Sequence, residues 1–152
     1  MKWVNLFLVL VVVAGILGIS GCTDNTASDV NRTTYGDYAE RSTPNGVNPQ
    51  WQVHLTKSSP FLDNATVDKV LEKIKPTSED TEDGYTNIQT GTKTINGLTA
   101  YYKTYTTEDN DIEEEFYFEK NGEWYLIYWQ DQQGNPNKSA IDSEIAYYMN
   151  KL

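Results

Sequence analysis

The sequence is poor in the residues that most often build catalytic and metal centres. Among 152 residues there is one cysteine, Cys22, and one histidine, His54. A single cysteine excludes an intramolecular disulfide, a CxxC redox pair and a multi-cysteine metal site. Neither a catalytic triad nor a zinc site can be assembled around the lone histidine from the sequence. We therefore expect His54 to face solvent, and we assign no catalytic residue.

Basic residues are also scarce. The chain has 12 Lys and Arg against 22 Asp and Glu, which gives a formal net charge of −10 at pH 7. This balance opposes binding to nucleic acid or to an anionic membrane surface. The sequence also contains no P-loop, dinucleotide-binding fingerprint or nucleophile elbow. We expect no nucleic-acid partner and no cofactor.

The first 22 residues have the pattern of an export signal. One basic residue, Lys2, precedes an apolar run from Trp3 to Ile19, and small residues then lead to Cys22. This order is typical of a secretory signal peptide. A membrane-spanning helix is the alternative, because the run is close to the roughly 20 apolar residues that such a helix needs. No basic stop-transfer cluster follows the run, which favours the signal peptide.

The residues Ile19-Ser20-Gly21-Cys22 resemble the lipobox of bacterial and archaeal lipoproteins: an aliphatic residue, two small residues and the cysteine that is acylated. The resemblance implies cleavage before Cys22 and attachment of lipid to its thiol. A stray buried thiol is the alternative, but the position of Cys22 at the end of an apolar leader favours an anchor. Two acyl chains hold a protein stably on a membrane, whereas one is marginal. The expected location is the cell membrane, facing outside the cytoplasm.

The residues after the cysteine are rich in Asn, Asp, Ser, Thr and Gly and contain few aliphatic side chains. Such a segment buries too little apolar surface to offset the entropy lost on ordering. The chain is therefore predicted to divide into three parts: a signal peptide over 1–21, an acylated cysteine and flexible polar tether over 22–48, and one folded domain over 49–152.

The folded domain shows strand and helix patterns in a definite order. Apolar and polar residues alternate over 51–57 and predict a half-buried strand. Apolar residues at helical spacing predict two amphipathic helices, over 63–76, with Asp63 or Asn64 as the cap, and over 139–152, and an acidic loop over 77–84 follows the first. Asn96-Gly97 and Asn121-Gly122 predict two-residue hairpin turns between strands. The expected fold is α+β, with two amphipathic helices on an antiparallel meandering sheet.

This order and its local sequence resemble the PsbP-like family, small α+β domains named after an extrinsic subunit of photosystem II and found in many prokaryotic lipoproteins. The resemblance covers about residues 51–152. It is carried by Ile95-Asn96-Gly97-Leu98, by the hairpin over 119–127 and by the closing helix. Members of this type usually have a clear hairpin ahead of the tryptophan strand, and residues 46–55 show no such pattern. The matching motifs concern the fold and imply no catalytic activity.

Two surface features are candidate binding sites. Aromatic residues crowd the strands around the second hairpin, and we predict a binding face that includes Tyr117, Trp124 and Tyr128. The alternative is that these side chains are core and ordinary surface. The acidic stretch 108–115 offers Asp109, Asp111 and Glu113 as oxygen ligands for a cation, although the EF-hand order is absent. The alternative there is a solvated loop with edge charges that oppose aggregation.

These observations support three functional hypotheses. The first is a lipid-anchored, non-enzymatic module that binds a protein or an envelope component. The second is a small hydrolase, which would need convergent acids or a partner for the histidine that the sequence does not show. The third is an extracytoplasmic cation-binding accessory protein that uses the acidic stretch.

Overall fold

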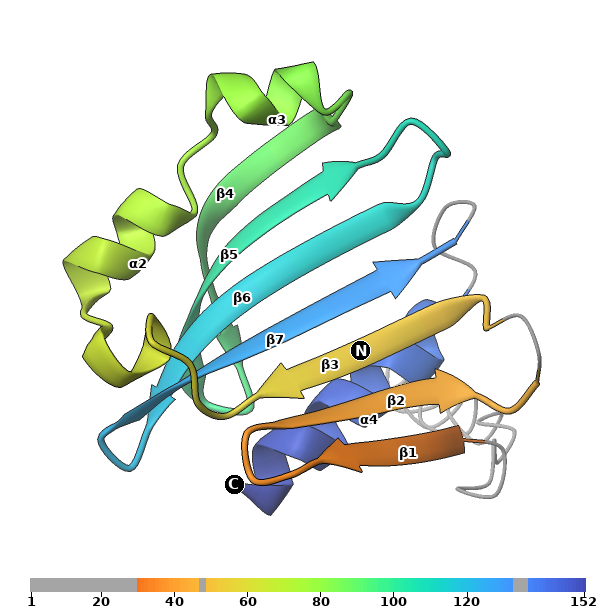
Figure 1. The fold of residues 1–152 in the computed structure, drawn as a ribbon, viewed down its shortest axis with the longest axis vertical. Coiled ribbons are helices and arrows are strands. Elements are labelled where there is room, and N and C mark those ends of the chain that lie inside the picture. Colours follow the sequence, from red (N-terminus) through yellow and green to blue (C-terminus); the bar gives the residue numbers. More distant parts are fainter. Residues whose placement is uncertain (1–29, 47–48, 133–136) are drawn as a thin grey trace, which may run out of the picture.

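The computed structural model describes residues 30–46, 49–132 and 137–152, so the signal peptide and Cys22 lie outside the described residues. Seven antiparallel strands form one sheet in the order β1-β2-β3-β7-β6-β5-β4 (Figure 1). The α+β class predicted from the sequence is confirmed. The strands are β1 (Val30–Tyr35), β2 (Ala39–Pro44), β3 (Trp51–Thr56), β4 (Thr86–Ile95), β5 (Leu98–Thr106), β6 (Ile112–Lys120) and β7 (Glu123–Asp131).

Both predicted Asn-Gly turns are present. Asn96 and Gly97 have φ values of 48° and 78°, and Asn121 and Gly122 have values of 56° and 82°. These are the positive values that a type I′ turn requires at both central positions. The second turn also produces the predicted register between β6 and β7, which pairs Lys120 with Glu123, Phe118 with Tyr125, Phe116 with Ile127 and Glu114 with Trp129.

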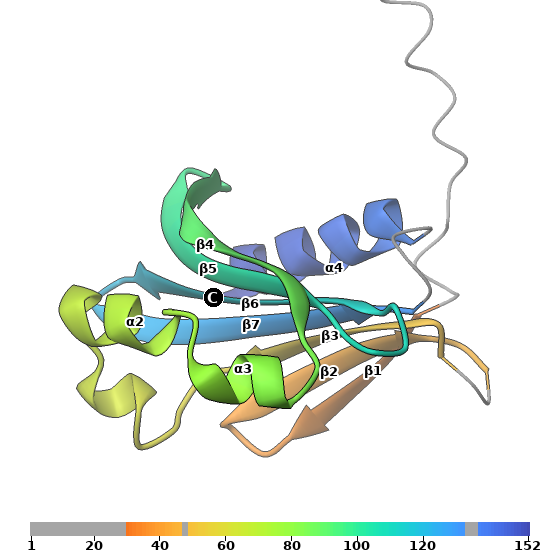
Figure 2. The ribbon, with the colours of Figure 1, turned by 90° about the horizontal axis from the view of Figure 1, so that it is seen from above.

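Helix α4 (Lys138–Lys151) covers one face of the sheet and closes the main core (Figure 2). The predicted helical spacing is confirmed, because Ile141, Ile145, Tyr148 and Met149 are all buried there. They pack on inward-facing side chains of β3, β5, β6 and β7. Within the described residues, no helix has the length and apolar character that a membrane span requires.

The opposite face carries a short 3₁₀ turn η2 (Leu62–Asn64), α2 (Val67–Lys73) and α3 (Ser78–Glu82). Val70 and Ile74 are buried in a second core, as predicted. Two further members of the predicted apolar stripe are outside it, because Val67 and Leu71 are 42% and 39% exposed. Helix α2 is short, so only one side of two turns reaches the sheet.

The acidic segment 77–84 was expected to be a loop, and this prediction was wrong because residues 78–82 form α3. The backbone N–H of Thr77 donates to Asp80 Oδ2 at 2.6 Å, which closes a capping box at the start of the helix. The second carboxylate oxygen of Asp80 accepts from Lys103 Nζ at 2.5 Å. One aspartate thus caps the helix and fixes it to β5.

The tether prediction was wrong for residues 30–44, because they form the hairpin of β1 and β2. Polar side chains attach this hairpin to α4. Arg32 on β1 donates to Glu144 from Nε at 2.9 Å and from Nη2 at 2.7 Å. Ser42 on β2 donates to the same carboxylate at 2.8 Å. The composition of this segment did not indicate a hairpin, because charge-assisted hydrogen bonds, instead of the burial of apolar side chains, provide much of its stabilisation.

Candidate binding face

The antiparallel register lines up two polar rows on the face of the sheet opposite α4. In the first row, Cα pairing places Arg41 beside His54, His54 beside Tyr128, and Tyr128 beside Glu115. In the second row, Gln52, Gln130, Glu113 and Tyr105 follow one another across β3, β7, β6 and β5. Side chains at alternate positions of a strand share a face, so both rows point the same way.

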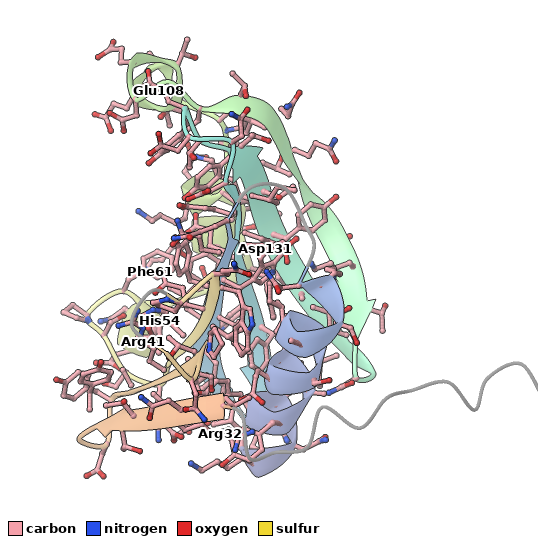
Figure 3. All side chains as sticks on the ribbon, turned by 90° about the vertical axis from the view of Figure 1, so that its right-hand side faces the viewer. Arg32, Arg41, His54, Phe61, Glu108 and Asp131 are labelled. Carbon is pink, nitrogen blue, oxygen red and sulfur yellow. The ribbon has the colours of Figure 1, made fainter. Side chains whose placement is uncertain are left out.

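This surface is called the open face below and consists of Arg41, Gln52, His54, Tyr105, Glu113, Tyr128 and Gln130. In Figure 1 no helix of the described residues lies across the near side of β1, β2 and β3, whereas α2 and α3 lie near β4, and Figure 2 shows them on the side of the sheet away from α4. Figure 3 shows Arg41 and His54 on the side away from α4, together with Phe61 of the second core. All seven side chains of the open face are partly buried.

A chain of hydrogen bonds holds the amide side chains of the open face in place. Arg41 Nη2 donates to Gln52 Oε1 at 2.8 Å, and His54 Nε2 lies 3.2 Å from the same oxygen. Gln52 Nε2 donates to Gln130 Oε1 at 2.5 Å. Gln130 Nε2 then donates to Asp111 Oδ2 at 2.8 Å. The orientation of each amide is therefore set by its neighbours before any ligand arrives.

The other end of the open face is aromatic and acidic. Tyr105 donates its hydroxyl to Glu113 Oε2 at 2.8 Å, and its ring stacks on Tyr85 with 4.3 Å between centroids. Burial, followed by the neighbouring Glu113 carboxylate, raises the pKa of both Tyr105 and Tyr128 far above the ordinary value. Both tyrosines therefore stay neutral and keep a hydroxyl proton to donate.

His54 lies on the polar side of β3, as the sequence predicts, but its ring is only partly exposed. Its ring packs edge-on against Tyr128 with 5.9 Å between centroids and is partly buried. Burial, and then the positive charge of Arg41, lower the pKa of His54 below its ordinary value. The imidazole is consequently neutral at neutral pH, and it contributes a hydrogen-bonding group without adding charge.

A cavity of about 540 Å³ opens at the Arg41 end of the open face. It is lined by Arg41, Pro49, Trp51, Gln52, Gln130 and Gln132. Arg41 Nε is buried there without a hydrogen-bond partner among the described residues. A buried donor without an acceptor costs free energy, so the guanidinium is an under-satisfied group beside a polar cavity.

The three aromatic residues predicted to form a binding face project from the same side of the sheet, but they do not form one exposed surface. Tyr117 is only 2% exposed and packs against Phe61 in the second core, so as a contact residue it was predicted wrongly. Trp124 lines a different cavity of about 490 Å³, with Lys57 and Leu62 among its other walls. Tyr128 lies on the open face.

The acidic residues proposed as cation ligands are not gathered into a site. Asp111 accepts from Gln130, and Glu113 accepts from Tyr105. Asp109 lies in the exposed turn before them. Over residues 30–46, 49–132 and 137–152 there is no group of three or more His, Cys, Asp or Glu side chains that could hold a metal ion. The described residues thus offer the cation hypothesis no preformed site.

Comparison with known proteins finds similarity in structure but not in sequence family. The sequence matches no protein-family model and no curated protein. Among solved structures, the solution structure of cyanobacterial PsbP from Synechocystis sp. PCC 6803 is similar, with 15% sequence identity and a TM-score of 0.36. The alignment covers 83% of this chain and 92% of that chain. Membership of the PsbP-like family stays a prediction, whereas the α+β class follows from the sheet and helices of this chain.

Sequence reasoning missed Arg41, Gln52 and Gln130. Arg41 was assigned to the tether, and no apolar alternation around it marks β2 as a strand. The two glutamines are the polar members of alternating strands, which ordinarily face water. The available signal was the register: once β3 and β7 are paired, Gln52 lies directly opposite Gln130.

Proposed function

We propose that this chain is a lipid-anchored, extracytoplasmic and non-enzymatic module that binds a protein or an envelope component through the open face. Lipid on Cys22 holds the module at the outer surface of the cell membrane. The sheet and its helices form a rigid support, and the open face presents the contact residues.

One observation carries this proposal: a row of polar and aromatic side chains crosses several strands without a helix of the described residues over it. Its amides are pre-oriented by hydrogen bonds from Arg41 through Gln52 and Gln130 to Asp111. Groups fixed in this way lose little conformational entropy on binding, which favours recognition. Tyrosine and arginine are also enriched at binding surfaces.

The same side chains give less support to catalysis. His54 and Glu115 flank Tyr128, and burial lowers the pKa of His54 and raises that of Glu115. Perturbed pairs of this kind occur in active sites. However, Glu115 accepts from Tyr117 at 3.3 Å and His54 is bonded to Gln52, so neither activates a nucleophile within the described residues. Binding accounts for the arrangement without a reaction.

The anchor is tested on the native protein. Mass spectrometry of the mature amino terminus should find residue 22 first, with a diacylglyceryl group on its sulfur. Cys22→Ser should prevent acylation and shift the protein from the lipid-modified membrane fraction. An unmodified thiol, or a retained leader, contradicts the proposed anchor.

The binding surface is tested with a photo-crosslinking phenylalanine analogue placed at one of two positions in the intact lipoprotein. Tyr128 and Trp124 are both partly exposed aromatics on the same side of β7, which makes Trp124 the matched control. Crosslinks should form from position 128 and decrease when His54→Ala is added. Equal crosslinking from position 124, or none from 128 in a folded protein, contradicts the proposed surface.

A further inference from the structure

The two arginines of the described residues have contrasting surroundings. Arg32 holds the Glu144 carboxylate with Nε and Nη2, at 2.9 Å and 2.7 Å. Arg41 has no acidic partner among the described residues. Its Nη2 donates to the neutral amide of Gln52 at 2.8 Å, and no described residue accepts from its Nε–H. In a chain with a net charge of −10, an arginine without a carboxylate is unusual and points to a ligand that supplies one.

The cavity beside Arg41 has the size and lining of a small-molecule site. Its volume of about 540 Å³ lies within the range of roughly 300–1,000 Å³ that is common for ligand pockets. Three glutamines, Gln52, Gln130 and Gln132, line it together with Arg41, and no acidic residue of the described part of the chain lines it. Primary amides both donate and accept, which suits a ligand with several hydroxyl groups.

We propose that this cavity binds a sugar acid, with the ligand carboxylate on Arg41 and its hydroxyl groups on the glutamine amides. This inference rests on the proposed function, since it names the ligand class for one end of the open face. The planar fork of a guanidinium matches the two oxygens of a carboxylate.

The charge of the site favours a single negative charge on the ligand. Among the described residues, Arg41 is the only cationic side chain that lines the cavity, and the neighbouring His54 is neutral at neutral pH because burial and Arg41 lower its pKa. Asp111 lies one hydrogen bond beyond Gln130 and disfavours additional negative charge. A monocarboxylate therefore fits the site better than a phosphate dianion.

Binding should also satisfy the buried donor. In the proposed complex the ligand carboxylate accepts from Nε–H and one Nη–H of Arg41, the geometry that Arg32 already shows with Glu144. The signal of the Arg41 Nε–H group is consequently a direct reporter of ligand binding.

The test uses the intact, ¹⁵N-labelled lipoprotein in detergent micelles, titrated with glucuronate and separately with glucose. The Arg41 Nε–H signal and the side-chain amide signals of Gln52 and Gln130 should shift saturably with glucuronate and stay unchanged with glucose. Equal shifts with both sugars contradict a role for the carboxylate. Shifts with N-acetylalanine but none with glucuronate contradict the sugar class and indicate a peptide carboxylate.

Variants separate a specific site from general attraction of an anion. Arg41→Lys keeps the charge but removes the planar fork, and it should weaken glucuronate binding by at least about tenfold. Lys75→Gln removes one positive charge from an exposed pair with Glu72 and should leave the affinity unchanged. Equal weakening by both variants contradicts a site at Arg41.

The two proposals can fail separately. Crosslinking from position 128 without any glucuronate shift discards the sugar-acid ligand and leaves the proposed binding face standing. Absence of both signals in folded protein discards both.

Discussion

Lys103 and Asp80 form an ion pair between β5 and α3, with 2.5 Å between Nζ and Oδ1. Their side chains are only 9% and 10% exposed. Burial on its own raises the pKa of Asp80. The hydrogen bonds from Lys103 and from the backbone of Thr77 lower it by more, so the net pKa lies below the ordinary value. The carboxylate is thus stabilised in its charged form by two donors.

Removing the lysine should leave the buried Asp80 carboxylate without its ion-pair partner and so destabilise the fold. Lys103→Met is expected to reduce the free energy of unfolding by about 3 kcal/mol at neutral pH. Because the folded-state pKa of Asp80 is lowered, its contribution in the wild type is present above the unfolded-state pKa and is lost as the pH falls through the folded value. Urea denaturation at pH 7 and at pH 3 measures both effects.

An exposed pair provides the control for this prediction. Lys75→Met breaks the ion pair with Glu72, whose partners are both well exposed, and should change stability by less than about 0.5 kcal/mol. If Lys103→Met costs no more than this control, Asp80 does not depend on Lys103.

The hairpin of β1 and β2 is the element that sequence patterning missed. Apolar periodicity predicted β3 and α4, and the Asn-Gly pairs predicted the two hairpin turns. On β1 the side chains after Val30 are all exposed, and β2 buries Glu40 and Ser42. Partners distant in sequence make these positions favourable, and a single sequence does not reveal such partners.

Arg32→Ala tests how much the hydrogen bonds from Arg32 to Glu144 stabilise this hairpin. The substitution leaves the buried Glu144 carboxylate with Ser42 as its one remaining side-chain donor among the described residues. We expect a loss of about 2 kcal/mol in the free energy of unfolding and faster amide hydrogen exchange in β1 and β2 than in β6. The double variant Arg32→Ala, Glu144→Gln should recover part of the loss, because it removes the unpaired charge. An unchanged rate of amide hydrogen exchange in β1 contradicts this stabilising role of Arg32.

The candidate site was predictable only in part, for the same reason. Tyr128 was identified from its aromatic neighbours, and the register of β6 and β7 followed from one turn. Tyr117 was misjudged because alternation gives the face of a side chain but not whether a helix covers that face. Arg41 required knowledge that β2 pairs with β3, a contact that no local pattern in residues 39–44 indicates.

Across the whole molecule, neutral tyrosines are built into both cores and the open face. Burial first, and then the Glu123 carboxylate, raise the pKa of Tyr125 to about 12. Burial, together with Glu40 and Glu144, raises the pKa of Tyr148 to about 12 despite the opposing hydrogen bond with Ser42. An unfolded chain ionises its tyrosines near pH 10. Folding therefore retains protons that the unfolded chain releases above this pH.

The protein should consequently lose stability as the pH rises above 10. A tyrosine with a raised folded-state pKa stabilises the fold fully below the unfolded-state pKa, and this contribution is lost as the pH rises toward the folded value. Each such tyrosine adds a slope of up to about 1.4 kcal/mol per pH unit. Urea unfolding between pH 9 and pH 11.5 measures the total slope.

Phenylalanine variants identify which tyrosines produce this slope. Tyr125→Phe should make the slope shallower, whereas Tyr38→Phe, at a ring that is 57% exposed, should leave it as in the wild type. An identical slope in Tyr125→Phe contradicts the assignment to the buried ring.

Strand β1 begins at Val30, only eight residues after Cys22. A fully extended stretch of that length reaches about 28 Å. In the proposed lipoprotein, a short linker therefore holds the start of the sheet close to the lipid headgroups. The start of β1 then lies within that distance of the bilayer, so the partner should be sought first among envelope molecules near the membrane surface.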